Sequence, residues 1–202
     1  MKRLPFLFLA LSVLVIADAR PSSAHPHVWV TVKTALVYST DGKFTAVRYQ
    51  WTFDEMFSTF AAQGLDANGD GKLSREELQG LAQVNVTSLK DFNYFTRVRA
   101  DEKEVRLSDP KEFWLEHANG ALTLNFVLPL ATPVNAKSVD LDIYDPTIFV
   151  DLKLAEQEPV ALEGAAANCK VVLTGPAGNA LAPPPNSNFG SQYGNKISVN
   201  CV

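Results

Sequence analysis

Residues 66–77 (DANGDGKLSREE) limit most narrowly what this chain can fold into. Their spacing matches the twelve-residue loop with which a helix–loop–helix hand binds calcium. Asp66, Asn68 and Asp70 place side-chain oxygens at loop positions 1, 3 and 5, and Glu77 stands at position 12. A loop of this kind joins two helices, so the sequence predicts a helix on each side of it.

The other loop positions fit the same pattern. Gly71 occupies position 6, where the backbone turns sharply, and Lys72 at position 7 would contribute only its carbonyl oxygen. Leu73 is the apolar anchor at position 8, and Ser74 at position 9 can bind directly or through water. The alternative is a polar Asx/Gly turn that matches by chance. The predicted calcium ligands are Asp66, Asn68, Asp70, Lys72, Ser74 and Glu77, with three formal negative charges.

Both flanks of the loop are typical of amphipathic helices. Phe53, Met56, Phe57 and Phe60 recur at i, i+3, i+4 and i+7, which predicts one apolar helical face before the loop. After the loop, Leu78, Leu81 and Ala82 begin a second helix or broken pair that reaches about residue 92. Ser74 and Glu77 also have the spacing of a capping box at the start of this helix.

Residues 1–24 have the pattern of a secretory signal peptide, with a basic start, an apolar stretch at residues 4–17 and small residues up to Ala24. The apolar stretch is short for a bilayer span, and an uncleaved anchor is the alternative. No later segment is apolar for long enough to cross a membrane. We therefore expect a periplasmic or secreted protein that has no membrane span once the signal is removed.

The expected mature chain, residues 25–202, has the length of a single domain with a real core. The whole chain has 18 Lys and Arg against 22 Asp and Glu. Removing three basic residues and one acidic residue with the signal makes the net charge −6. A mildly acidic surface without a basic stripe argues against nucleic acid as a partner.

Alternating, β-rich runs at residues 28–40 and 43–53 flank Asp41-Gly42, a two-residue hairpin signal. Pairing across this turn sets Leu36 against Val47, Val32 against Trp51 and Val30 against Phe53. The second run leads directly into the first helix of the hand, so the hand is an insertion at about residues 53–92. Further strands are expected at residues 94–100, 104–107, 113–118, 121–128, 138–144, 148–154, 160–163, 170–173 and 196–201.

Many short strands with turn signals favour an antiparallel β-sandwich or curled sheet. The predicted fold class is therefore α+β, with the helix–calcium loop–helix hand inserted into that sheet structure. Residues 175–190 form an uncharged loop rich in Pro, Asn and Gly. The two cysteines, Cys169 and Cys201, favour a disulfide in an exported chain, worth roughly 3–4 kcal/mol. A redox or thiolate metal site is the alternative, but it lacks the usual close spacing.

His25 and His27 are candidate ligands for nickel, zinc or copper. Cleavage after Ala24 would make His25 the first residue, so a free amine and two imidazoles would lie close together. Pro26 has no N–H to lose, which blocks a square-planar site through the next amides. The hairpin register also sets Trp29 opposite Asp54. The alternative is a frayed terminus with solvated histidines.

The other polar residues favour structural roles. His117 pairs with Leu122 in the predicted register, which favours a satisfied histidine at the edge of the core. Asp140 and Asp142 alternate with apolar residues, as on a sheet with one wet face, and Asp151 is a further acid. No phosphate loop, zinc-protease helix or nucleophile elbow is present. We therefore expect no enzymatic activity.

The chain resembles a bacterial periplasmic family of unknown function, the domain-of-unknown-function family numbered one thousand and seven. The resemblance rests on residues 25–28 (HPHV), 51–55 (WTFDE) leading into the calcium-type loop, 91–96 (DFNYFT), 144–147 (YDPT) and the two cysteines. Members are often labelled as the periplasmic component of an uncharacterised ABC-type transport system. The resemblance implies a role near nickel, cobalt or zinc transport, with a membrane metal transporter as partner.

Three functions follow as hypotheses. The first is a calcium-binding accessory of divalent transition-metal transport, in which His25 and His27 touch the transported ion. The second is a structural or interaction module that calcium stabilises and that binds no transition metal. The third, a copper enzyme with an N-terminal histidine, lacks a convincing second histidine. Calcium hands that act as sensors usually come in pairs, so a single loop favours a stabilising role over a switch.

Overall fold

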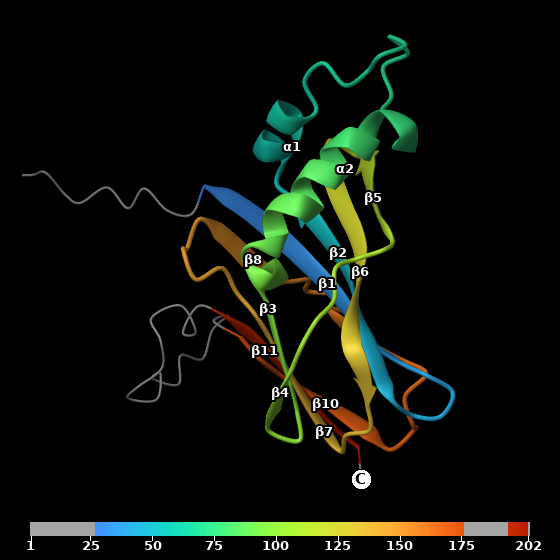
Figure 1. Ribbon diagram of the computed structural model, residues 1–202. Helices are drawn as coiled ribbons and strands as arrows, with labels where there is room; N and C mark the ends of the chain where they lie inside the picture. Colours follow the sequence, from blue (N-terminus) through green and yellow to red (C-terminus); the bar gives the residue numbers. More distant parts are fainter. Residues whose placement is uncertain (1–26, 176–193, 202) are drawn as a thin grey trace, which may run out of the picture.

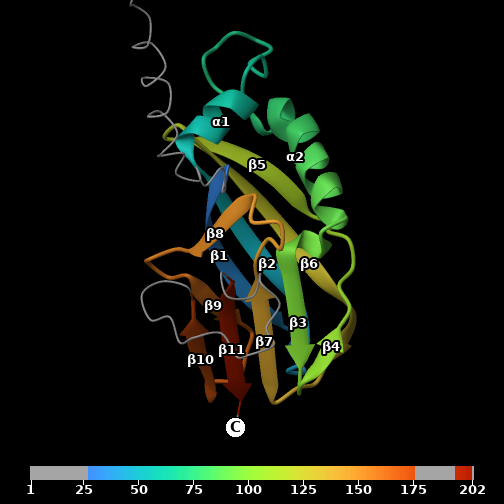
Figure 2. The same cartoon turned by 90° about the vertical axis from the view of Figure 1, so that its left-hand side faces the viewer.

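The computed structural model describes residues 27–175 and 194–201, and they form two β-sheets and two α-helices (Figure 1). The predicted signal peptide, His25 and most of the predicted loop at 175–190 lie outside the described residues. The mixed α+β class is confirmed. Figures 1 and 2 both show the helices gathered at one end of the molecule and the second sheet at the other.

The first sheet is built around the predicted hairpin. Strand β1 (Val28–Tyr38) pairs antiparallel with β2 (Phe44–Phe53), and Leu36 lies opposite Val47 as predicted. Next to β2 come β6 (Ala121–Val134) and then β5 (Phe113–Ala118), which forms the edge. On its other side β1 pairs with β8 (Val150–Leu154) and, further along, with β9 (Val160–Glu163).

Strands β8 and β9 both run parallel to β1, so the prediction of an antiparallel sheet is wrong at this edge. A parallel neighbour needs a long crossover, and here both helices and strands β2 to β7 lie between β1 and β8 in the sequence. No turn motif in the sequence indicates such a pairing, so the alternating pattern alone could not predict it.

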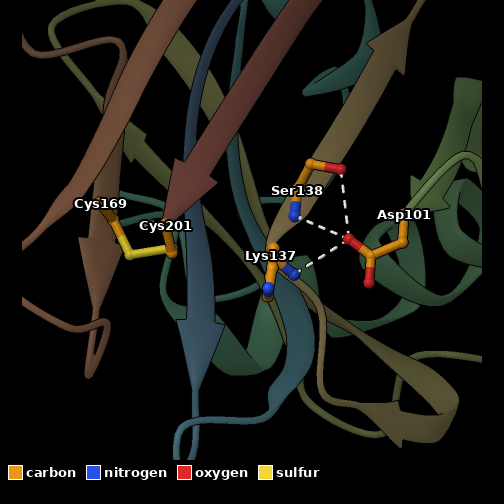
Figure 3. Close-up of a disulfide and its surroundings, with 5 residues drawn as sticks. All are labelled: Asp101, Lys137, Ser138, Cys169 and Cys201. Atoms are coloured by element: carbon orange, nitrogen blue, oxygen red, sulfur yellow. Dashed lines mark hydrogen bonds between the residues drawn. A yellow bond between two sulfur atoms is a disulfide. The ribbon is translucent and has the colours of Figure 1, made fainter.

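The second sheet has the order β10-β11-β7-β3-β4. Its neighbouring strands all pair antiparallel. The predicted disulfide is present and joins Cys169 to Cys201, which lie opposite each other on the paired strands β10 and β11 (Figure 3). The bounds are β3 (Thr96–Ala100), β4 (Lys103–Val105), β7 (Ser138–Ile143), β10 (Cys169–Thr174) and β11 (Asn195–Cys201).

The core lies on one face of the first sheet and is rich in aromatic side chains. Tyr49, Trp51 and Phe126 are fully buried there, and the Trp51 ring is edge-on to both neighbours. The buried residues of the second sheet, such as Leu141, join the same cluster. Where the second sheet ends, helix α2 (Arg75–Lys90) covers the first sheet through Leu78, Ala82 and Val86.

Two local features differ from prediction. The hairpin between β1 and β2 turns through three residues between Ser39 and Lys43, with Gly42 at φ +78°. One extra residue on β2, Thr45, restores the predicted register beyond the turn. Helix α1 (Glu55–Ala61) turns only part of its predicted apolar face inward. Phe53 and Phe57 pack in or against the core, whereas Met56 and Phe60 are 69% and 73% exposed.

A left-handed turn, η1 (Asn93–Phe95), connects α2 to β3, so β3 begins two residues later than predicted. Three successive residues have φ values of 51°, 54° and 50°, a conformation that costs about 1–2 kcal/mol for each non-glycine residue. Burial of Tyr94 and Phe95 offsets this cost, and Phe95 stacks on Trp51. The Thr96 hydroxyl also donates a hydrogen bond to the Tyr94 carbonyl at 2.7 Å.

Candidate metal centre

Asp66, at position 1 of the predicted calcium loop, organises the backbone of that loop. Its Oδ1 accepts hydrogen bonds from the N–H groups of Gly69 and Asp70, and its Oδ2 accepts one from Gly71 at 2.9 Å. Gly69 and Gly71 have φ values of 72° and 76°, which a residue with a β-carbon rarely adopts. The glycine pattern and the first aspartate therefore define one compact turn, as the sequence predicts.

Glu77, at position 12, closes the other end of the loop. Its Oε1 accepts a hydrogen bond from the Ala67 N–H at 2.9 Å and its Oε2 accepts one from the Ser74 N–H at 2.8 Å. The Ser74 hydroxyl accepts a hydrogen bond from the Glu77 N–H, which completes the predicted capping box at the start of α2. These donors, the Ser74 N–H above all, lower the pKa of Glu77 and favour its charged form.

The middle of the loop holds two more of the predicted calcium ligands, Asn68 and Asp70. The Asn68 side-chain oxygen accepts a hydrogen bond from the Asp70 N–H, and Asp70 Oδ1 accepts one from the Lys72 N–H, each at 2.8 Å. All of these residues are exposed. The side chains of Asn68 and Asp70 therefore follow the inside of the turn and remain open to solvent.

The donor set suits a hard cation, because every predicted side-chain ligand presents oxygen. Within the part of the chain that the structure describes, however, no three acidic, histidine or cysteine side chains converge as a metal cluster. The carboxylates of Asp66 and Glu77 instead accept hydrogen bonds from the loop backbone. Calcium bound through both oxygens of Glu77 would thus share this carboxylate with the Ala67 and Ser74 N–H groups.

Helix α1 is fixed to the first sheet at its start and in its middle. Asp54 caps α1 by accepting a hydrogen bond from the Phe57 N–H at 2.8 Å, and it also accepts one from the Trp29 N–H. The hydroxyl of buried Ser58 accepts a hydrogen bond from the Leu122 N–H of β6 at 2.9 Å. These bonds set the rotation of α1 and explain why its other side faces solvent.

The predicted transition-metal site is only partly described. His27 lies just before β1, where its backbone N–H donates a hydrogen bond to the Phe149 carbonyl at 2.9 Å. The centroids of the His27 and Phe149 rings lie 4.9 Å apart. His25 lies outside the described residues, so this pair stays a prediction. His117 pairs with Leu122 as predicted but is exposed, and its expected place at the core edge is wrong.

Asp140 and Asp142 lie on the outer face of the second sheet, as the wet-face interpretation expects. Asp140 accepts a hydrogen bond from the Ser198 hydroxyl at 2.6 Å, and the Arg99 guanidinium lies 3.5–3.6 Å from both carboxylates. Burial raises the pKa of Asp142, and the neighbouring Arg99 opposes this shift. Asp151, the third acid, is paired with Lys153 at 3.2 Å.

Asp145, the one buried carboxylate among the described residues, has no role predicted from the sequence. Its oxygens accept hydrogen bonds from the N–H groups of Thr147, Phe149 and Val150, and from the Thr147 hydroxyl. Asp145 therefore shapes the loop that leads into β8, beside the start of β1. An aspartate before Pro-Thr is an Asx-turn signal that could have indicated this.

Within the described ranges, no helix combines the length and apolar character needed to cross a bilayer. The architecture defines a class: a two-sheet α+β protein with a helix–loop–helix between the second and third strands. The chain belongs to the family described as "Protein of unknown function (DUF1007)", whose model matches residues 9–201.

The chain is similar to two uncharacterised proteins. An "Uncharacterized 15.5 kDa protein in trpE 3'region" of Spirochaeta aurantia is 35% identical over 99 residues, which cover 48% of this chain and 71% of that protein. An "Uncharacterized protein" of Haemophilus influenzae is 25% identical over 173 residues, covering 84% of this chain and 78% of that one. Neither name assigns an activity.

Proposed function

We propose that this protein is an exported calcium-binding module in which the ion stabilises the helix–loop–helix on the first sheet. The observation that carries the proposal is the loop itself. Asp66 accepts hydrogen bonds from three backbone N–H groups, and two glycines adopt positive φ. Glu77 reaches back to the start of the loop, where it accepts a hydrogen bond from the Ala67 N–H. This brings the oxygens of positions 1 and 12 to the same turn, as a calcium loop requires.

The anchoring of the loop supports a stabilising role. Leu65 and Leu73 pack against the main core, and the helices on either side are tied to strands of the first sheet. A ligand that binds only the folded chain stabilises it by mass action, by about 1.4 kcal/mol at a calcium concentration ten times Kd. Export is supported by the signal-like residues 1–24 and by the disulfide.

The family resemblance also supports, as a second hypothesis, a role near divalent-metal transport with a membrane transporter as partner. Among the described residues, His27 alone represents the predicted site, and its ring lies against Phe149. Calcium binding therefore comes first in our proposal, and transition-metal binding by His25 and His27 is a separate hypothesis.

The test compares melting temperatures with calcium, with magnesium and with a chelator. We expect calcium to raise the melting temperature of the parent protein, and Asp70→Asn and Glu77→Ala to lose that response. Glu76→Ala is the matched control, because Glu76 is an exposed acid on the same helical turn. A parent protein that melts at one temperature with and without calcium would refute the proposal.

A further inference from the structure

Arg75 reaches out of the loop. It is the tenth residue of the calcium-type loop and the first residue of α2. Its guanidinium carbon lies 4.8 Å from the centroid of the Trp114 ring, and its Nη2 donates to Glu116 Oε1 at 2.9 Å. Trp114 Nε1 donates to the same oxygen at 2.7 Å. We call these three side chains the Arg75 latch.

The latch crosses the edge of the first sheet. Trp114 and Glu116 belong to edge strand β5, where they flank the fully buried Leu115. Side chains alternate between the faces of a strand, so Trp114 and Glu116 lie on the outer face. The Arg75 side chain therefore passes from the first turn of α2 around β5 to the side of the sheet opposite the core.

On the side of the calcium-type loop, the latch begins in the first turn of α2. Arg75 stands between Ser74 and Glu77, the two residues of the capping box. If both oxygens of Glu77 bind calcium, the ion attracts the same carboxylate that holds the Ala67 and Ser74 N–H groups. Calcium would therefore act directly on the turn from which the Arg75 side chain projects.

Charge gives the direction of the effect. The Arg75 guanidinium lies on Glu116, and the negative charge of the loop also attracts it, because opposite charges attract over several ångströms in water. A bound divalent cation cancels most of the loop's negative charge. Glu116 then remains as the main acidic partner, so calcium favours the closed latch.

We infer that the Arg75 latch transmits calcium occupancy of the loop to the outer face of β5, where Trp114 reports it. This inference rests on the proposed calcium binding. By linkage the effect is reciprocal, since a latch that calcium strengthens must also strengthen calcium binding by the same factor.

The first experiment titrates calcium into the intact protein and follows tryptophan emission and heat in parallel. We expect an emission change with the same midpoint as the heat. Trp114→Phe should abolish that change and Trp29→Phe should retain it, because Trp29 lies outside the latch. A saturable heat with unchanged Trp114 emission would overturn the inference while the proposed function survives.

The second experiment measures the calcium Kd of Glu116→Gln, which weakens the latch and leaves the loop residues intact. An exposed ion pair has a small energy, so we expect Kd to rise about two- to five-fold. Glu112→Gln is the matched control, an exposed acid just before β5 whose carboxylate is outside the latch. Equal Kd values for the two variants would contradict the coupling.

Arg75→Lys gives a further check if circular dichroism finds Glu116→Gln unfolded. Lysine keeps the positive charge but has no planar group to lie on the indole, so the emission response of Trp114 should fall. A full response in Arg75→Lys would overturn the inference. Absence of any calcium heat in the parent protein would overturn both the inference and the proposed function.

Discussion

Trp29 and Asp54 bond to each other twice. The Trp29 N–H donates to Asp54 Oδ2 at 3.0 Å, and the Asp54 N–H donates to the Trp29 carbonyl at 2.9 Å. The second oxygen of the same carboxylate caps α1 through the Phe57 N–H. One aspartate therefore ends the hairpin, starts the helix and fixes the angle between them.

Asp54→Ala should lower the free energy of unfolding by about 1–2 kcal/mol, because α1 loses its N-cap and the Trp29 N–H of β1 loses its acceptor. Asp54→Asn should lose less, since an amide oxygen can still cap the helix. Urea denaturation of the two variants and the parent measures the difference. Equal midpoints for Asp54→Ala and the parent would show that the cap is unimportant here.

Asp101 should make stability sensitive to acid. The Ser138 N–H and then the Lys137 N–H donate to its Oδ1, each at 3.0 Å, and lower the pKa of this carboxyl (Figure 3). A lowered folded-state pKa adds stability above the unfolded pKa of about 3.9, and this stability is lost as pH falls through the folded value.

Asp101→Asn should therefore make the loss of stability between pH 5 and pH 2 less steep, as measured by urea denaturation across that range. Asparagine tolerates the positive φ of 45° at this position and keeps one acceptor oxygen. Ser138→Ala removes only the hydroxyl donor, so its pH dependence should stay closer to that of the parent. If the stability of Asp101→Asn falls with pH as steeply as that of the parent, this carboxylate is excluded as a source of acid sensitivity.

Glu102→Gly should raise the free energy of unfolding by about 1 kcal/mol. Glu102 sits in the turn between β3 and β4 with φ 67°, a conformation that favours glycine. Glu156→Gly is the matched control, an exposed glutamate outside the set of positive-φ residues, and it should be neutral or destabilising. Thermal unfolding of both variants tests the difference in sign.

The transition-metal hypothesis predicts binding of nickel, zinc or copper by the exported protein and its loss in the double variant His25→Ala/His27→Ala. His27 would have to turn its ring from Phe149 toward the ion. His117→Ala is the control, because this histidine is exposed on β5, away from the start of β1. Calorimetry that finds equal binding in the double variant and the parent would reject the hypothesis.

The sequence predicted features that short-range chemistry determines. The register of Leu36 against Val47 follows from strict alternation beside one turn, and the capping box follows from Ser74 and Glu77 alone. The bend at Asp66 likewise follows from its glycines. In each case, residues within a few positions of one another are sufficient to specify the geometry.

Features set by distant partners were missed. Four phenylalanine and methionine positions predicted an inward face for α1, but only Phe53 and Phe57 pack inward. The hydrogen bonds of Asp54 and Ser58 to the first sheet leave Met56 and Phe60 in solvent. Seven helical residues are too few for periodicity to outweigh two such anchors. The latch was missed for the same reason, because Arg75 meets Trp114 only after the sheet has formed.

The parallel pairing of β1 has a consequence for synthesis. One edge of β1 finds β2 within a few residues, but the other edge must wait for β8 and β9, beyond residue 150. A chain that emerges from its amino end therefore carries an unpaired strand edge until most of its length has followed. Until β8 and β9 arrive, that edge can pair with another chain, which makes it an aggregation risk during synthesis.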